Sequence, residues 1–65
     1  MRRPADEDVM KFIGDREVTA RELYAHFGAT DDTSRSAVRK TLISLVRYRF
    51  LSQRAENGMY IYKKV

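Results

Sequence analysis

The 65-residue sequence contains no cysteine and no tryptophan, only one proline and only three glycines. The lack of cysteine excludes disulfide bonds and thiolate metal sites, which often supplement the small core of so short a chain. No apolar run approaches the roughly 20 residues that span a bilayer, and no hydrophobic signal segment follows Met1. We therefore expect a single soluble, cytoplasmic domain over residues 1–65, with residues 1–4 as a flexible tail.

Recognisable catalytic patterns are also missing. No Ser/His/Asp arrangement, glycine-rich phosphate loop or paired-carboxylate motif is found. The single histidine, His26, has no cysteine or carboxylate pattern beside it and is interpreted as an ordinary surface residue. We expect no enzymatic activity, no metal, no cofactor and no small-molecule ligand.

Acidic residues are scarce in the second half of the chain. Residues 1–33 carry five basic and eight acidic side chains, whereas residues 34–65 carry eight basic side chains and only Glu56 against them. Solubility alone does not require the two signs to be segregated in this way. The asymmetry predicts a polyanionic partner.

Apolar spacing and capping residues predict two short helices in the first half. The first starts with Pro4 in its opening position, ends at Gly14 and buries Ala5, Val9, Phe12 and Ile13. The second starts at a capping box formed by Thr19 and Glu22, and Gly28 ends it. We expect a strand of one or two residues directly before this second helix.

The third predicted helix is capped by Asp32 or Thr33 and runs to about Tyr48. Its buried stripe consists of Val38, Leu42 and Leu45, with Thr41 beside it. The opposite face carries a set of mainly polar side chains: Ser36, Arg39, Lys40, Ile43 and Arg47.

A β-hairpin is predicted after Leu51, with strands "LSQR" and "MYIYKK" and a turn at Asn57-Gly58. Strand alternation puts Tyr60 and Tyr62 on one face, and Met59 and Ile61 on the other. We favour Met59 and Ile61 as the inner residues. A two-residue turn would instead pair Leu51 with the tyrosine face and bury the tyrosines, and both registers stay open.

This order of elements resembles that of winged helix-turn-helix proteins. "SRSAVRKTLISLVRYRFLSQR" resembles the recognition helix and first wing strand of bacterial winged-helix regulators, and "TARELYAHFG" is similar to their second helix. The resemblance covers about residues 18–62 and points to no single family. It implies an α+β winged helix-turn-helix fold, with three helices followed by a two-stranded hairpin wing. It also implies sequence-specific binding of double-stranded DNA by a small transcriptional regulator.

The resemblance places base contacts on Ser34, Arg35, Ser36 and Arg39, and Lys40 joins them by its position near the helix start. Neither Arg35 nor Arg39 has an acid three or four residues later, so we expect both to lack intrahelical ion pairs. Phosphate contacts are expected from a second group: Arg47, Arg49, Arg54, Lys63 and Lys64.

Two departures from the family pattern stand out. "ATDD" lengthens the turn before the third helix and puts two acids near the expected phosphates, and Arg49 replaces the usual glycine after that helix. Two other functions fit the same residues. One is a winged helix that binds a protein, or a second copy of itself, through Ile43, Tyr60 and Tyr62. The other is a nucleoid-type binder of DNA without sequence preference.

Overall fold

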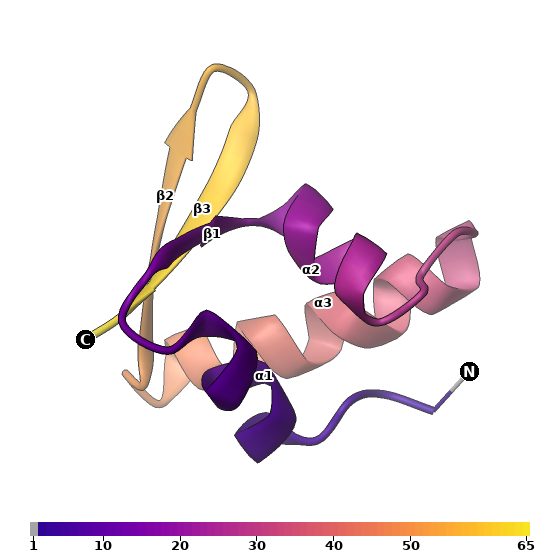
Figure 1. Ribbon diagram of the computed structural model, residues 1–65, viewed down its shortest axis with the longest axis horizontal. Helices are drawn as coiled ribbons and strands as arrows, with labels where there is room; N and C mark the ends of the chain where they lie inside the picture. Colours follow the sequence, from indigo (N-terminus) through magenta and orange to yellow (C-terminus); the bar gives the residue numbers. More distant parts are fainter. Residues whose placement is uncertain (1) are drawn as a thin grey trace.

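The computed structural model describes residues 2–65, and Met1, the first residue of the expected tail, lies outside them. The fold is α+β, with three helices and one antiparallel sheet of three strands. Figure 1 shows the elements in chain order: α1 (Asp6–Ile13), β1 (Glu17–Thr19), α2 (Ala20–His26), α3 (Asp32–Arg47), β2 (Leu51–Glu56) and β3 (Met59–Lys64).

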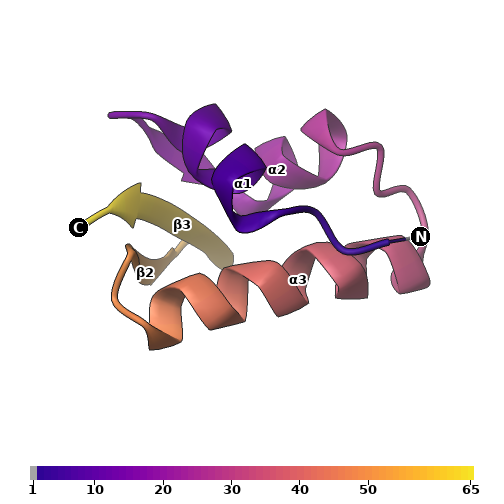
Figure 2. The same cartoon turned by 90° about the horizontal axis from the view of Figure 1, so that it is seen from below.

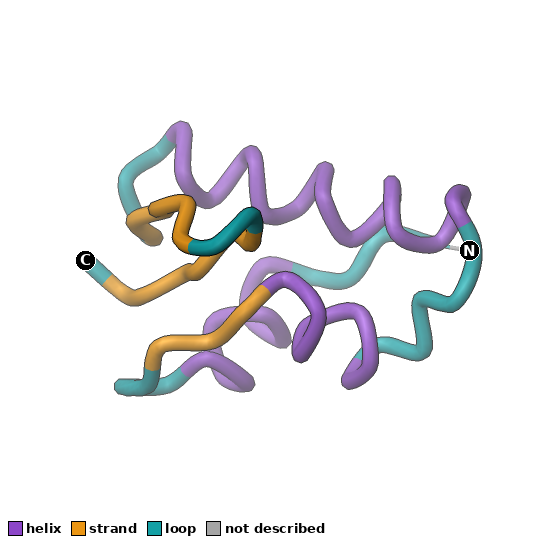
Figure 3. Tube along the Cα trace, turned by 90° about the horizontal axis from the view of Figure 1, so that it is seen from above, coloured by secondary structure: helices purple, strands orange, loops and turns teal. Residues whose placement is uncertain are grey.

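The helices form two layers, and the sheet lies at one end of them. Helix α3 runs along one side of the molecule, and α1 and α2 lie along the other (Figure 2). Figure 3 shows the β2–β3 hairpin near the C-terminal half of α3, with β1 on the side of the sheet away from α3. The core between the layers takes Val38, Leu42 and Leu45 from α3, as the apolar stripe predicted. Other elements complete it with Val9, Ile13, Val18, Leu23, Leu51 and Tyr62.

The hairpin has the two-residue turn that Asn57-Gly58 predicted. Both residues have positive φ, of 53° and 75°, and the pairing continues from Glu56 opposite Met59 to Leu51 opposite Lys64. This register puts Leu51 and Tyr62 on the same face of the sheet, and both are buried. The preference for Met59 and Ile61 as the inner residues was therefore wrong, because Tyr62 is only 4% exposed and occupies the core in their place.

Strand β1 joins the sheet through β3, in the order β1-β3-β2. The expected short strand before α2 is confirmed and is three residues long. Thr19 ends this strand and caps α2: its hydroxyl accepts the Glu22 backbone N–H at 3.1 Å, and the Glu22 carboxylate accepts the Thr19 N–H at 3.2 Å. The predicted capping box is thus present.

Helix α1 begins at Asp6, two residues later than the sequence suggested. Ala5 is its extended N-cap and is exposed, whereas Val9 and Ile13 are buried as expected. Pro4 lies before the helix, and its carbonyl accepts a hydrogen bond from the Thr41 hydroxyl of α3, at 2.8 Å. Residues 2–5, which we call the N-terminal arm, lie against α3 in this way.

Helix α3 ends with Arg49 in the left-handed conformation, at a φ of 65°. The Phe50 N–H donates to the Leu45 carbonyl at 2.9 Å, and the Arg49 N–H donates to the Val46 carbonyl at 3.1 Å. These two bonds form a Schellman motif, whose left-handed residue is usually glycine. Arg49 therefore adopts the left-handed backbone conformation that glycine usually supplies in this motif.

Thr19→Ala should lower the free energy of unfolding by about 1 kcal/mol, because it opens the capping box and leaves a backbone donor of α2 without its partner. Urea unfolding followed by circular dichroism measures this loss. Thr30→Ala is the matched control, because no hydrogen bond involves the Thr30 side chain within residues 2–65. Equal stabilities of the two variants would contradict the capping role.

Arg49→Gly should raise the free energy of unfolding by up to about 1 kcal/mol relative to Arg49→Ala. Glycine adopts positive φ without steric cost, and this gain exceeds the entropy that glycine adds to the unfolded chain. Both variants remove the same charge, so their difference in urea unfolding isolates the backbone conformation. A more stable alanine variant would contradict this interpretation.

Candidate functional site

At the start of α3, Asp31 and Asp32 both form hydrogen bonds with groups of the first helical turn. Asp31 is the N-cap, one residue earlier than the nearer of the two predicted candidates, and its carboxylate accepts the Ser34 N–H at 2.7 Å. This backbone hydrogen bond lowers the pKa of the Asp31 carboxyl. Asp32, the next residue, accepts a hydrogen bond from the Arg35 guanidinium at 2.6 Å. The two acids of the "ATDD" segment therefore both have partners within the first turn.

Arg35 is consequently tied to the helix start. Its guanidinium also donates to the Thr30 carbonyl at 3.0 Å, so it points back towards the loop before α3. The expectation that Arg35 lacks an intrahelical ion pair was wrong, because its acidic partner lies three residues earlier rather than later. Ser34 lies four residues before the buried Val38, on the same side of the helix, and is half-buried.

The exposed face of α3 carries the remaining predicted residues of the helix. Arg39, Lys40 and Arg47 are exposed, and none of them forms an ion pair within residues 2–65. Ser36 is half-buried on the same face, one turn before Lys40. Ile43 lies among these residues with 54% of its surface exposed. The α3 face, defined as Ser36, Arg39, Lys40, Ile43 and Arg47, is thus a strip with unneutralised positive charge.

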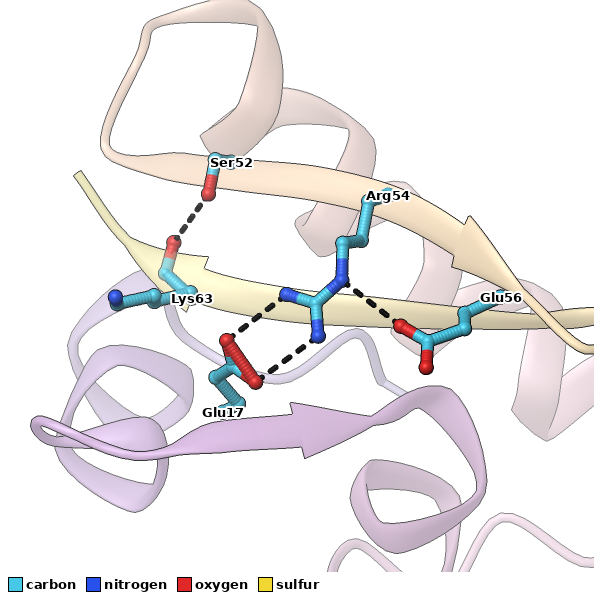
Figure 4. Close-up of polar contacts among 5 residues, drawn as sticks. All are labelled: Glu17, Ser52, Arg54, Glu56 and Lys63. Carbon is cyan, nitrogen blue, oxygen red and sulfur yellow. Dashed lines mark hydrogen bonds and ion pairs between the residues drawn. The ribbon is translucent and has the colours of Figure 1, made fainter.

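On the sheet, Arg54 is neutralised by two acids (Figure 4). From β2 its guanidinium crosses β3 and binds both carboxylate oxygens of Glu17 on β1, at 2.9 and 3.0 Å. It also donates to Glu56 at 3.2 Å. The hydrogen bonds raise the pKa of Arg54, and the same contact lowers the pKa of the Glu17 carboxyl. The predicted phosphate contact at Arg54 therefore falls on a side chain already bound within the protein.

The other two predicted residues of the hairpin, Lys63 and Lys64, are exposed and form no ion pair in the described part of the chain. Lys63 lies opposite Glu17 in the sheet, and Lys64 lies opposite Leu51. Tyr60 is 52% exposed near the turn, whereas the buried Tyr62 is too enclosed to form the partner contact expected of it. Of the basic residues that the sequence analysis assigned to DNA, those without an ion pair within residues 2–65 are Arg39, Lys40, Arg47, Arg49, Lys63 and Lys64.

The N-terminal arm reaches this region and was missed by sequence reasoning. Arg3 donates from Nε to the Thr41 hydroxyl at 3.1 Å, and the same hydroxyl donates to the Pro4 carbonyl. Arg3 then lines a shallow groove together with Ser36, Arg39 and Lys40. The one sequence signal was Thr41 itself, because a hydroxyl beside an apolar stripe needs a hydrogen-bond partner once it is buried.

Two other features carry less weight. His26 is exposed and stacks on Phe12 of α1, with ring centroids 4.0 Å apart. Within residues 2–65 no group of three or more histidine, cysteine or acidic side chains could hold a metal ion. The α3 face and its flanks are the candidate site.

Because the pKa of the Asp31 carboxyl is lowered, the free energy of unfolding should depend on pH in the acidic range. A carboxyl whose pKa is lowered in the folded state stabilises the protein at pH values above its ordinary pKa of 3.8. This contribution is lost as the pH falls through the lowered pKa. Asp31→Asn retains a good N-cap without a titrating group. Urea unfolding from about pH 6 to about pH 2 should show a smaller acid loss of stability in Asp31→Asn than in the wild type. Parallel curves for the two proteins would contradict the cap assignment.

No protein-family model, curated protein or solved structure matches this chain. In the described part of the chain, no helix combines the length and apolar character needed to cross a membrane. The proposal for the α3 face consequently depends on its own residues, contacts and charges.

Proposed function

We propose that this protein is a winged helix-turn-helix domain that binds double-stranded DNA sequence-specifically and acts as a small transcriptional regulator. In this proposal α2 and α3 form the helix-turn-helix, α3 enters the major groove, and the β2–β3 hairpin is the wing. The element order and the three-stranded sheet with β3 in the centre support it. Further support comes from the charges and contacts of the α3 face.

The observation that carries the proposal is the uncompensated charge of the α3 face. In the described part of the chain Arg39, Lys40 and Arg47 have no acidic partner, while both acids near the start of the helix are bound, Asp31 by a backbone N–H and Asp32 by Arg35. An α-helix fits the major groove of B-DNA, and exposed arginines there bind the O6 and N7 atoms of guanine. From Ser36 to Arg47 the face is about 16 Å long, at 1.5 Å per residue.

The contacts divide the residues into two groups. Ser36, Arg39 and Lys40 lie in the N-terminal half of α3, the part of a recognition helix that faces base edges, and are proposed to read the sequence. Arg47, Arg49, Lys63 and Lys64 are proposed to bind phosphates, which position the protein without reading bases. Arg35 and Arg54 are left out of the proposed contacts, because their guanidinium groups already bind acidic side chains of the same chain at the protein surface.

A protein-binding role for the same surface is the second candidate, and Ile43 favours it. An isoleucine that is 54% exposed among cations is unusual for a purely polar contact, and Tyr60 is similarly exposed on the hairpin. In a DNA complex Ile43 would contact a thymine methyl group, which is an apolar target in the major groove. Ile43→Ser therefore distinguishes the two: it should weaken binding to thymine-containing sites or abolish a protein contact.

The test of the function starts from selection of bound sequences out of a random duplex pool. Titration of the selected duplex and of a random duplex at two salt concentrations then gives the specificity. Tighter binding to the selected duplex supports the proposal. Equal affinity for all duplexes would indicate a nucleoid-type binder, and no binding would leave the face to a protein partner.

Arg39→Ala should change the free energy of unfolding by less than about 0.5 kcal/mol, because Arg39 is exposed and has no ion pair. It should weaken binding to the selected duplex by about 1–3 kcal/mol and binding to random duplex by less, as expected for loss of a base contact. Lys11→Ala on α1, which also removes one exposed charge, is the control and should leave the specificity unchanged. Equal losses on both duplexes would make Arg39 a phosphate contact.

A further inference from the structure

We propose that the N-terminal arm is a second DNA contact, in which Arg2 and Arg3 bind backbone phosphates on the flank of α3 that lies away from the hairpin. The inference rests on the proposed function and extends it to residues that we expected to form only a flexible tail. It assigns a role to Thr41, whose buried hydroxyl holds the arm in place.

The arm is fixed to α3 by one side chain. Thr41 has no exposed surface, and both hydrogen bonds of its hydroxyl go to the arm: it accepts from Arg3 Nε at 3.1 Å and donates to the Pro4 carbonyl at 2.8 Å. Apart from Tyr62, Thr41 is the only buried residue within residues 2–65 that carries a polar side-chain group. A buried hydroxyl whose hydrogen bonds both go to one extended segment fixes the position of that segment.

This anchoring leaves part of Arg3 free. Its Nε is used by Thr41, and its guanidinium approaches Asp6 at 3.8 Å, which is a long contact between exposed groups. The terminal nitrogens therefore remain accessible to an anion. Arg2, the preceding residue, is exposed and forms no ion pair in the described chain.

The arm and α3 enclose a shallow groove with the chemistry of a phosphate site. Arg3 lines it from the arm, and α3 contributes Thr33, Ser36, Arg39 and Lys40. The groove thus presents three cations and two hydroxyl side chains. Its one acid, Asp32, is already bound to Arg35. A phosphodiester has the charge and the acceptor oxygens that this set of donors binds.

The arm and the hairpin lie on opposite flanks of the α3 face. Arg35, at one border of the buried stripe, lines a second groove with Met59 and Tyr60 of the hairpin. Thr41, at the other border, holds the arm. Figure 2 shows the arm running beside α3 towards the start of that helix. The two phosphate backbones of a duplex border its major groove. With α3 in that groove, one backbone would therefore lie near the cations of the arm and the other near those of the hairpin.

The experiment separates the anchor from the charge. Thr41→Val keeps every charge and removes both arm contacts, and Arg3→Ala removes one cation. Ser44→Ala, which removes another α3 hydroxyl without a hydrogen bond in the described chain, is the matched control. Circular dichroism and melting temperature establish that each variant is folded. ¹⁵N relaxation of the Arg2, Arg3 and Ala5 amides should show a mobile arm in Thr41→Val and an ordered one in Ser44→Ala.

Binding is measured on the selected duplex as a function of salt. Arg3→Ala should weaken binding on the order of tenfold and reduce the slope of log K against log salt by about 1, the signature of one lost phosphate contact. Thr41→Val should also weaken binding. The double variant Arg3→Ala/Thr41→Val should bind no more weakly than the double variant Arg2→Ala/Arg3→Ala. The selected sequence should stay the same in all variants, because phosphates carry no sequence information.

A neutral methylphosphonate placed at single positions of the duplex locates the contact. At one backbone position beside the major-groove site, this substitution should weaken binding of the duplex by the wild type but leave binding by Arg3→Ala unchanged. If Arg3→Ala binds as the wild type does while Arg39→Ala loses specificity, the arm inference falls and the proposed function stands. If the wild type binds no duplex, both fall. A changed sequence preference in Arg3→Ala would overturn the phosphate assignment and place the arm against bases.

Discussion

The apolar stripe of α3 is the contact on which the rest of this molecule depends. Val38, Leu42 and Leu45 meet residues from α1, β1, α2, β2 and β3, so one helix face joins every other element to a single core. A chain of this size without disulfide bonds has no second core to rely on. The stripe also determines which side chains are exposed, because fixing one side of α3 against the core leaves Arg39, Lys40 and Arg47 on the opposite side in solvent.

The ion pairs divide the basic residues by role. The sequence predicted one positive surface from the eight basic residues of its second half. Two of these residues form ion pairs instead: Arg35 binds Asp32 at the start of α3, and Arg54 on β2 binds Glu17 on β1. Exposed ion pairs contribute little to stability individually. The cations of the α3 face, Arg39, Lys40 and Arg47, by contrast form no ion pair within residues 2–65.

Local signals in the sequence predicted most of the fold. The capping box at Thr19, the Asn57-Gly58 turn and the α3 stripe each depend on residues within a few positions of one another, and each is present. The exact N-cap of α3 was missed because Asp31, Asp32 and Thr33 are all acceptable caps. The inner face of the hairpin depended on register, and the two-residue turn chose Tyr62 over Met59 and Ile61.

The site was less predictable, because its details depend on residues far apart in sequence. The Arg54–Glu17 and Arg3–Thr41 contacts each join residues nearly 40 positions apart, and no local pattern announces them. The Arg35–Asp32 pair was local, but only later acids had been considered. Composition did point to the second half of the chain, and the α3 face lies there. It could not show that the N-terminal arm returns to the same helix.

Thr19 gives the sheet and α2 a shared residue. It is the last residue of β1, paired with Ile61 at the centre of the sheet, and it is also the N-cap of α2. No linker separates the strand from the helix. The direction in which α2 leaves the sheet is therefore set by one residue, which is paired with β3 on one side and hydrogen-bonded to the first turn of α2 on the other.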